Sequence, residues 1–164
     1  MKVKFIIRDI GEMTAELYPE KAPLTVQNFV SLVKARFYDG LIFHRVIPGF
    51  MIQGGGFDAD FRQKEAKSIR GEFRQNGFPQ NDILHKRGVL SMARTMVPDS
   101  ASSQFFIMHK DAPHLDGAYA AFGKVTEGLD VIDRIANTPT TSRGYYDDVP
   151  RQAVVIETIE LLDE

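Results

Sequence analysis

The chain has no cysteine, and its 164 residues carry little net charge. Without thiols it has no disulfide, Fe–S cluster, cysteine-ligated zinc or cysteine nucleophile, which leaves its 4 histidines as the soft metal ligands. The 20 basic and 22 acidic residues give a formal net charge of −2, which argues against a general nucleic-acid binder. A chain of this length buries enough surface to fold without a disulfide or a metal ion.

Long hydrophobic runs are also absent. Near the N-terminus Lys2 and Lys4 precede an apolar run, residues 5–7, which Arg8 and Asp9 end at once. A secretory signal needs about 7–15 apolar residues and a membrane helix about 20, so neither is indicated. We therefore expect a cytoplasmic protein that does not associate with a membrane, forming one domain over residues 1–164.

Most apolar segments are short and β-like, separated by clusters of Gly, Pro, Asn and Asp, which predicts an all-β barrel or sandwich. The expected strands are 3–8, 13–18, 41–47, 50–53, 88–93, 104–108, 119–125 and 153–162. Apolar residues at three- and four-residue steps predict helices over 24–36 and 128–136. Residues 54–87 are polar and glycine-rich, and such a long connection either borders a binding site or is a solvated excursion.

Several familiar chemistries lack essential parts in this sequence. The glycines of residues 54–56 are not followed by the Gly-Lys-Ser/Thr of a phosphate-binding loop or by the third glycine of a dinucleotide site. Ser102 and Ser103 are not surrounded by a nucleophile-elbow sequence. The spacing of His109, His114 and Asp116 matches no common zinc pattern, so we expect surface or packing histidines and no metal.

One unusual run, residues 43–55, combines a cation, large apolar groups and an amide. Strand alternation places Phe43 and Arg45 on one face and His44 on the other. Taken alone, these features leave two interpretations open. In the first, the apolar residues are simply core, Arg45 forms a surface ion pair, and the glutamines form hydrogen bonds to loops. In the second, residues 43–55 form a binding site together with the strand 104–108.

Four segments together resemble the cyclophilin family of peptidyl-prolyl isomerases. They are residues 43–55, Ser-Gln-Phe-Phe-Ile at 103–107, Leu-Asp-Gly at 115–117 and Phe-Gly-Lys-Val at 122–125. The first helix, with Pro-Leu-Thr-Val-Gln-Asn-Phe at 23–29, and Gly-Val-Leu-Ser-Met-Ala at 88–93 extend the match over nearly the whole chain. The resemblance implies an all-β fold, a closed eight-stranded antiparallel β-barrel with two α-helices covering the ends.

The resemblance also implies an activity, the cis/trans isomerisation of X-Pro peptide bonds in peptides and in unfolded or nascent proteins, with no cofactor. It implies three catalytic residues, Arg45, Gln53 and Phe50. The implied substrate-binding residues are Met51, Phe106, Leu115, Gln104, Ala93, Arg94, His114, Tyr119 and His44. A non-catalytic proline-peptide binding or chaperone module is the alternative, and the intact arginine and pocket set disfavours it.

Three positions depart from the best-known eukaryotic pattern of the family. His114 stands in place of a tryptophan whose indole is associated with cyclosporin binding, so we expect only weak affinity for cyclosporin A. Tyr119 replaces a histidine at the pocket edge, and Arg94 replaces an asparagine, which adds a cation that favours acidic peptides. We expect a monomer with no nucleic-acid partner.

Overall fold

The computed structural model describes residues 1–162, which form ten strands, two α-helices and two short 3₁₀ helices. The strands are β1 (Lys2–Ile7), β2 (Gly11–Leu17), β3 (Arg45–Ile47), β4 (Met51–Gly54), β5 (Val89–Met92), β6 (Phe105–Met108), β7 (Ala121–Glu127), β8 (Thr140–Arg143), β9 (Tyr146–Pro150) and β10 (Ile156–Leu162). The helices are α1 (Pro23–Lys34), α2 (Leu129–Ala136) and the 3₁₀ turns η1 (Arg74–Asn76) and η2 (Pro113–Leu115).

Eight of the strands form one curled antiparallel sheet in the order β10-β1-β2-β7-β5-β6-β4-β3. Its two end strands are not joined by a ladder. Instead residues 41–43, which precede β3, pair with residues 154–156 at the start of β10 through a short closing seam. Phe43 N–H donates to the Val154 carbonyl at 3.0 Å, and Ile156 N–H donates to the Leu41 carbonyl at 2.8 Å. The expected eight-stranded antiparallel sheet is confirmed, and its closure is shorter than a full strand pair.

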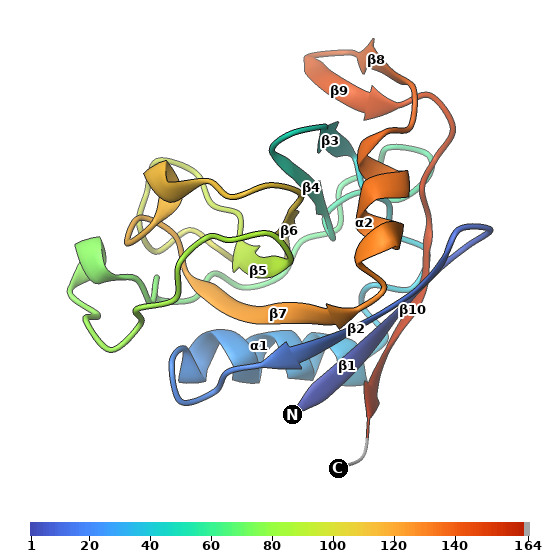
Figure 1. Cartoon of the computed structure of the whole chain (residues 1–164). Coiled ribbons are helices and arrows are strands. Elements are labelled where there is room, and N and C mark those ends of the chain that lie inside the picture. The colour runs from blue at the N-terminus through green and yellow to red at the C-terminus, as the bar shows by residue number, and fades with distance from the viewer. Residues whose placement is uncertain (163–164) are drawn as a thin grey trace.

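The two predicted α-helices are present, with ends within two residues of those expected at 24–36 and 128–136. In Figure 1, α1 lies below β2 and β7, whereas α2 stands above them near β3 and β4. Phe29 of α1 fills the centre of the core, with ring centroids 5.8 Å from Phe105 and 5.1 Å from Phe122. The helix therefore closes one side of the curled sheet with an apolar face.

The strand expected over 41–47 differs from the one observed. Only Arg45–Ile47 forms a ladder, and it pairs with β4. The segment before it turns into the closing seam, so Phe43 is fully buried in the main core instead of sharing the exposed face of Arg45. The prediction that Phe43 and Arg45 lie on one face is wrong, because simple alternation requires an unbroken strand.

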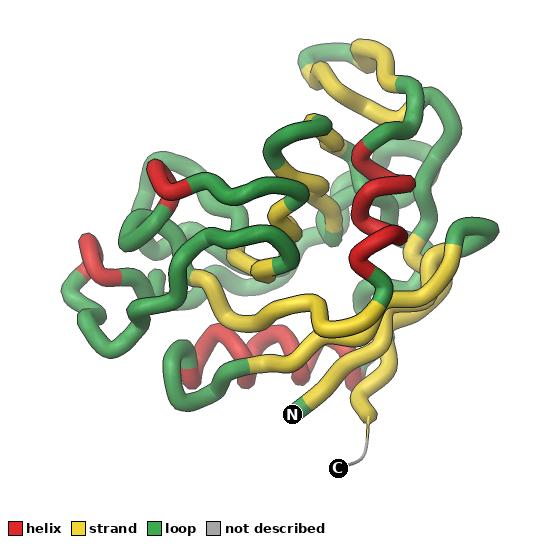
Figure 2. Tube along the Cα trace, viewed as in Figure 1, coloured by secondary structure: helices red, strands yellow, loops and turns green. Residues whose placement is uncertain are grey.

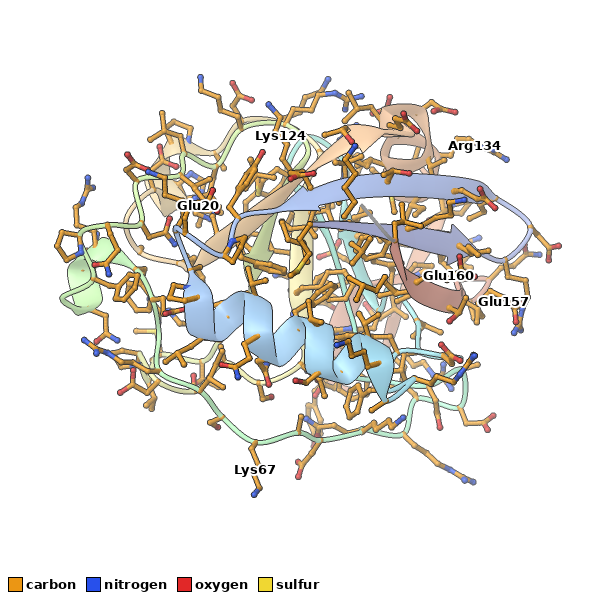
Figure 3. The ribbon with its side chains drawn as sticks, turned by 90° about the horizontal axis from the view of Figure 1, so that it is seen from below. Glu20, Lys67, Lys124, Arg134, Glu157 and Glu160 are labelled. Carbon is orange, nitrogen blue, oxygen red and sulfur yellow. The ribbon has the colours of Figure 1, made fainter. Side chains whose placement is uncertain are left out.

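Charged side chains cover the outside of the molecule. Figure 3 shows labelled side chains that project away from the core, namely Glu20, Lys67, Lys124, Arg134, Glu157 and Glu160. Long loops join β4 to β5 and β5 to β6, and Figure 2 shows them in green, apart from η1 in the first, which is red. No helix of residues 1–162 is both long and apolar enough to cross a membrane.

Candidate functional site

A cavity of about 170 Å³ opens beside the ends of β3, β4 and β6. It is lined by Arg45, Phe50, Met51, Gln53, Ala93, Arg94, Phe106, Leu115 and Tyr119. Its volume is below the roughly 300–1,000 Å³ of sites for drug-sized ligands, which suits one small ring. Every one of these residues is a site residue expected from the sequence. The expected residues that do not line it are Gln104, His114 and His44.

The pairing of neighbouring strands explains why these side chains meet. Arg45 of β3 lies opposite Gln53 of β4, which lies opposite Phe106 of β6. Residues directly opposite one another in a sheet point to the same face, so the three form one row, the site row. The neighbouring positions Val46, Ile52 and Ile107 form the core row, which is wholly buried on the other face.

Hydrogen bonds hold the arginine at the rim of the cavity. The exposed Arg45 guanidinium donates from Nη1 to Gln53 Oε1 at 3.2 Å, and Gln53 Nε2 donates to Gln104 Oε1 at 3.0 Å. Gln104 lies against the backbone of Gly56, where an added Cβ would be 2.4 Å from its Nε2. The last glycine of the run at 54–56 is therefore explained by close packing against Gln104.

The floor of the cavity is an apolar cluster separate from the main core. Its buried members are Met51, Val89, Phe106, Met108, Ala112, Leu115 and Ala121, and Phe50 and Tyr119 pack against it partly buried. The ring of Tyr119 meets Phe106 edge-on at 5.7 Å. Phe106 and Leu115 retain only 5% and 8% exposure, so the cavity floor is a packed apolar surface. Apolar rings bind such surfaces through hydrophobic burial.

Arg94 forms one wall of the cavity and is held in a fixed position. Its guanidinium carbon lies 4.6 Å from the ring centroid of Tyr119 and 4.7 Å from that of Phe73. Nε and Nη2 both donate to the Ala118 carbonyl, at 3.2 and 2.6 Å, and Nη1 donates to Thr95. The cation therefore ties the loop after β5 to the loop that carries Tyr119.

Two expected residues lie at the edge of the cavity. Gln104 lines an adjoining hollow of about 220 Å³ that shares Gln53, Ala93 and Arg94 with the main cavity. His114 is exposed, and its ring is 5.8 Å from that of Phe50. Both residues therefore border the cavity without lining it.

The expectation that His44 contributes to substrate binding is not supported by its position. Its side chain points to the opposite face from Arg45 and is buried against Phe57, with ring centroids 4.7 Å apart, and near Tyr146 at 6.3 Å. Nδ1 is buried without a hydrogen-bond partner. Burial, with a smaller effect of the Arg45 charge, lowers the pKa of His44 to about 4. His44 is a neutral packing residue behind the site.

A buried polar group behind the cavity was missed by sequence reasoning. His85 stacks on the back of Phe106, with Nε2 2.8 Å from Ser91 Oγ and Nδ1 3.2 Å from Asp116 Oδ1. Burial lowers the pKa of His85, and the bond to Asp116 opposes that effect. No spacing links these three residues, and nothing in the sequence distinguishes them. With His85 1% exposed and Ser91 fully buried, the group supports the cavity wall and does not reach a ligand.

The chemistry available at the cavity follows from what lines it. Its titratable side chains are Arg45, Arg94 and Tyr119, with no carboxylate, imidazole or thiol among the lining residues. Among residues 1–162, no three His, Asp or Glu side chains come close enough to hold a metal ion. The arrangement offers a hydrogen-bond donor of fixed charge beside an apolar pocket, which suits binding and charge stabilisation better than proton transfer.

Known proteins match this chain over almost its full length. The sequence profile of the family described as cyclophilin type peptidyl-prolyl cis-trans isomerase/CLD matches residues 2–161. A peptidyl-prolyl cis-trans isomerase of Acinetobacter baylyi is 47% identical over 159 residues, which cover 93% of this chain and 81% of that protein. Peptidyl-prolyl cis-trans isomerase B of Escherichia coli is 40% identical over 158 residues, covering 91% and 93%.

A solved structure gives the same answer for the fold. The crystal structure of a cyclophilin type peptidyl-prolyl cis-trans isomerase of Cryptosporidium parvum, in the presence of the dipeptide Ala-Pro, superposes with a TM-score of 0.82 at 28% identity and covers 100% of both chains. The fold, the family profile and the near full-length relatives agree, and the chain belongs to the cyclophilin-type peptidyl-prolyl cis-trans isomerases, enzymes that act on X-Pro peptide bonds.

Proposed function

We propose that Arg45 catalyses the isomerisation while Phe50, Met51, Phe106 and Leu115 hold the proline ring. The observation that carries this proposal is the position of the Arg45 guanidinium, at the rim of an apolar cavity and bonded to Gln53. Arginine is always charged and presents planar donors in a fixed geometry. It is therefore suited to stabilise a group that appears only during the reaction.

The reaction itself explains why a single donor is enough. Rotation about an X-Pro amide has a barrier of about 18–20 kcal/mol, because the nitrogen lone pair is delocalised into the carbonyl. When the amide twists, the nitrogen becomes pyramidal and its lone pair becomes able to accept a hydrogen bond. A donor placed there favours the twisted amide over both planar forms, which is how differential binding accelerates a reaction. Arg45 donates to this nitrogen.

The apolar pocket and the arginine make different contributions to the kinetics. The pocket grips the proline ring in the planar and the twisted states alike, so it sets the affinity for substrate. Arg45 gains its hydrogen bond only in the twisted state, so it sets kcat. Gln53 holds Arg45 in place through its 3.2 Å bond and offers its amide to the substrate backbone. Phe50 closes the pocket directly beside the twisting bond.

The remaining site residues contact the rest of the peptide. Gln104 and Ala93 extend the groove away from the proline, since both line the adjoining hollow. Tyr119 and Arg94 form the wall near the loop, where the added cation favours acidic peptides. His114 packs near Phe50 at the outer edge, and without an indole there the site binds cyclosporin A weakly.

We further propose the domain organisation, the oligomeric state, the substrates and the cellular compartment of this enzyme. Residues 1–164 act as one isomerase domain, because strands from the two ends of the described chain, β1 and β10, are neighbours in one sheet. We also propose that the protein acts as a monomer. Its substrates are X-Pro segments of unfolded or nascent proteins in the cytoplasm, with no nucleic-acid partner. Size-exclusion chromatography tests the monomer, and cell fractionation tests the compartment. Capture of unfolded clients by the parent protein and by its Arg45→Ala variant tests the substrates.

The proposed mechanism is tested by the variants Arg45→Ala and Arg45→Lys, with Arg36→Ala as the control. Arg36 is exposed near the end of α1 and pairs with Asp39. If Arg45 supplies about 4 kcal/mol in the twisted state, its removal lowers kcat about a thousandfold. Exchange NMR on an Ala-Pro peptide measures the rate, since uncatalysed exchange takes about 10–100 s.

Three results are expected from these variants. Arg45→Ala keeps the thermal unfolding midpoint of the parent and loses almost all catalysed exchange. Arg45→Lys recovers little of the rate, because an ammonium lacks the planar donor geometry of the guanidinium. Arg36→Ala keeps the parental rate. A near-parental rate in Arg45→Ala removes Arg45 from the mechanism.

A further inference from the structure

The turn between β3 and β4 carries a backbone N–H that the turn itself does not use. Phe50 N–H donates to the Ile47 carbonyl at 3.0 Å, with Pro48 and Gly49 between them. Proline in the second position and a glycine with φ of +83° in the third are the features of a type II turn. Gly49 N–H lies outside this bond and donates instead to Nδ1 of His109 at 2.8 Å.

His109 also holds the end of this turn through its backbone. Its N–H donates to the Phe50 carbonyl at 2.9 Å, and the N–H of Lys110 donates to the same oxygen at 3.3 Å. Both bonds are made to the backbone of Phe50, a residue that lines the cavity. His109 therefore binds the turn at two consecutive residues. Its side chain accepts a hydrogen bond from Gly49, and its backbone N–H donates one to Phe50.

The other side of the His109 ring is anchored to α2. Nε2 lies 3.0 Å from Oδ1 of Asp133, and His109 is 7% exposed. Arg87 binds the same carboxylate with two donors, at 2.7 and 3.0 Å, and lowers the pKa of Asp133. Because Gly49 N–H can only donate, Nδ1 must be the acceptor, and Nε2 must carry the ring proton and donate it in a hydrogen bond to Asp133 Oδ1. Gly49 and Asp133 together therefore select the tautomer of His109 that is protonated at Nε2.

We infer that His109 is a positioning residue for the isomerase reaction: it sets the β3–β4 turn, and through it the ring of Phe50, from an anchor on α2. The inference rests on the proposed function in one respect, that Phe50 is a wall of the proline pocket. Since the pocket grips the ring before and during the twist, misplacing Phe50 weakens substrate binding and leaves the Arg45 donor in place. The loss falls on KM and not on kcat.

Three substitutions of His109 distinguish the effect of its hydrogen bond to Gly49 from that of its bond to Asp133. His109→Phe keeps a flat ring and removes both bonds. His109→Asn places an amide oxygen where Nδ1 lies, so it keeps the acceptor for Gly49 and is too short for Asp133. His109→Gln reaches Asp133 with a donor and does not offer the acceptor at the Nδ1 position. The proposal requires that the asparagine variant recover function better than the glutamine variant.

The kinetic test uses an Ala-Pro peptide with each variant. Loss of one hydrogen bond at the turn is expected to raise KM and the peptide Kd about three- to tenfold in His109→Phe. In the same variant kcat stays within about twofold of the parent, and His109→Asn returns KM toward the parental value. A fall in kcat at unchanged KM, or better recovery by His109→Gln, overturns the proposal.

Two NMR measurements on the folded parent protein keep the proposal testable if the phenylalanine variant unfolds. Imidazole ¹⁵N shifts should show Nδ1 of His109 unprotonated and Nε2 protonated, and a proton on Nδ1 contradicts the proposal. The Gly49 amide should exchange with solvent faster in His109→Gln than in His109→Asn. If Arg45→Ala retains the parental rate while these His109 results hold, the proposed mechanism fails and the positioning role stands.

Discussion

The buried carboxylate of Glu72 gives the sharpest prediction about stability. It lies in the loop between β4 and β5, is 1% exposed, and caps the N-terminus of α1 from 47 residues away. Its Oε1 accepts from the backbone N–H and from the hydroxyl of Thr25, both at 2.7 Å, and Oε2 accepts from Leu24 N–H at 3.2 Å. Ala22, at the cap position itself, has no side chain able to do this.

Removing the Glu72 carboxylate lowers the free energy of unfolding because buried hydrogen-bond donors lose their acceptor. In Glu72→Ala the fully buried hydroxyl of Thr25 and its N–H lose their partner. Each buried group without a partner costs about 1–3 kcal/mol, so we expect a total loss of about 3–5 kcal/mol. For a chain of this size 1 kcal/mol corresponds to about 2–4 °C, and Tm should fall by roughly 6–20 °C.

The assay is urea and thermal unfolding followed by circular dichroism, with two further variants as controls. Glu72→Gln keeps one acceptor oxygen of the same shape, so it should lose about half as much stability as Glu72→Ala. Glu65→Ala removes an exposed carboxylate from the same loop and should stay within about 0.5 kcal/mol of the parent. A loss below about 1 kcal/mol in Glu72→Ala refutes the assignment of Glu72 as the cap of α1.

Three further predictions concern the site and its surroundings. The folded pKa of His44, about 4, lies below that of an unfolded histidine. The unfolded state therefore binds more protons, and His44 should contribute a fall in stability of about 3 kcal/mol between pH 6.5 and 4; in urea titrations the fall should be smaller by that amount in His44→Phe. Gly56→Ala should displace Gln104 and lower kcat about two- to tenfold at parental Tm, and an unchanged kcat in exchange NMR contradicts this. Cyclosporin A should bind the parent weakly and His114→Trp more tightly in calorimetry, whereas a nanomolar Kd for the parent counts against the role of the ring at position 114.

Periodicity predicted the parts of the fold that have a buried apolar face. The helices and the strands of the large sheet follow this rule. The hairpin of β8 and β9 was missed because Thr140–Arg143 is largely exposed and its Thr-Thr-Ser-Arg sequence has no apolar alternation. The hairpin packs through Tyr146 against Phe57 and Phe61, and this contact is invisible to a local pattern.

The residues that line the cavity were all found through the family resemblance, because their types and order are distinctive. The polar residues that support the cavity and cap α1 were not found. Glu72 bonds to Thr25, and His109 to Gly49 and Asp133, across long stretches of sequence. A hydrogen bond between distant polar residues leaves no spacing to detect, so these roles required the structure.

Because the site row and the core row lie on opposite faces of the same strands, substitutions and changes of strand length have different effects. Substitutions at Arg45 or Gln53 alter only the outward face of the sheet and spare the core. A deletion or insertion of one residue in β3 moves the guanidinium inward and Val46 outward in a single step. We therefore expect a change of length in this strand to disturb the core and the proposed site together, whereas a substitution at Arg45 should leave the core row in place.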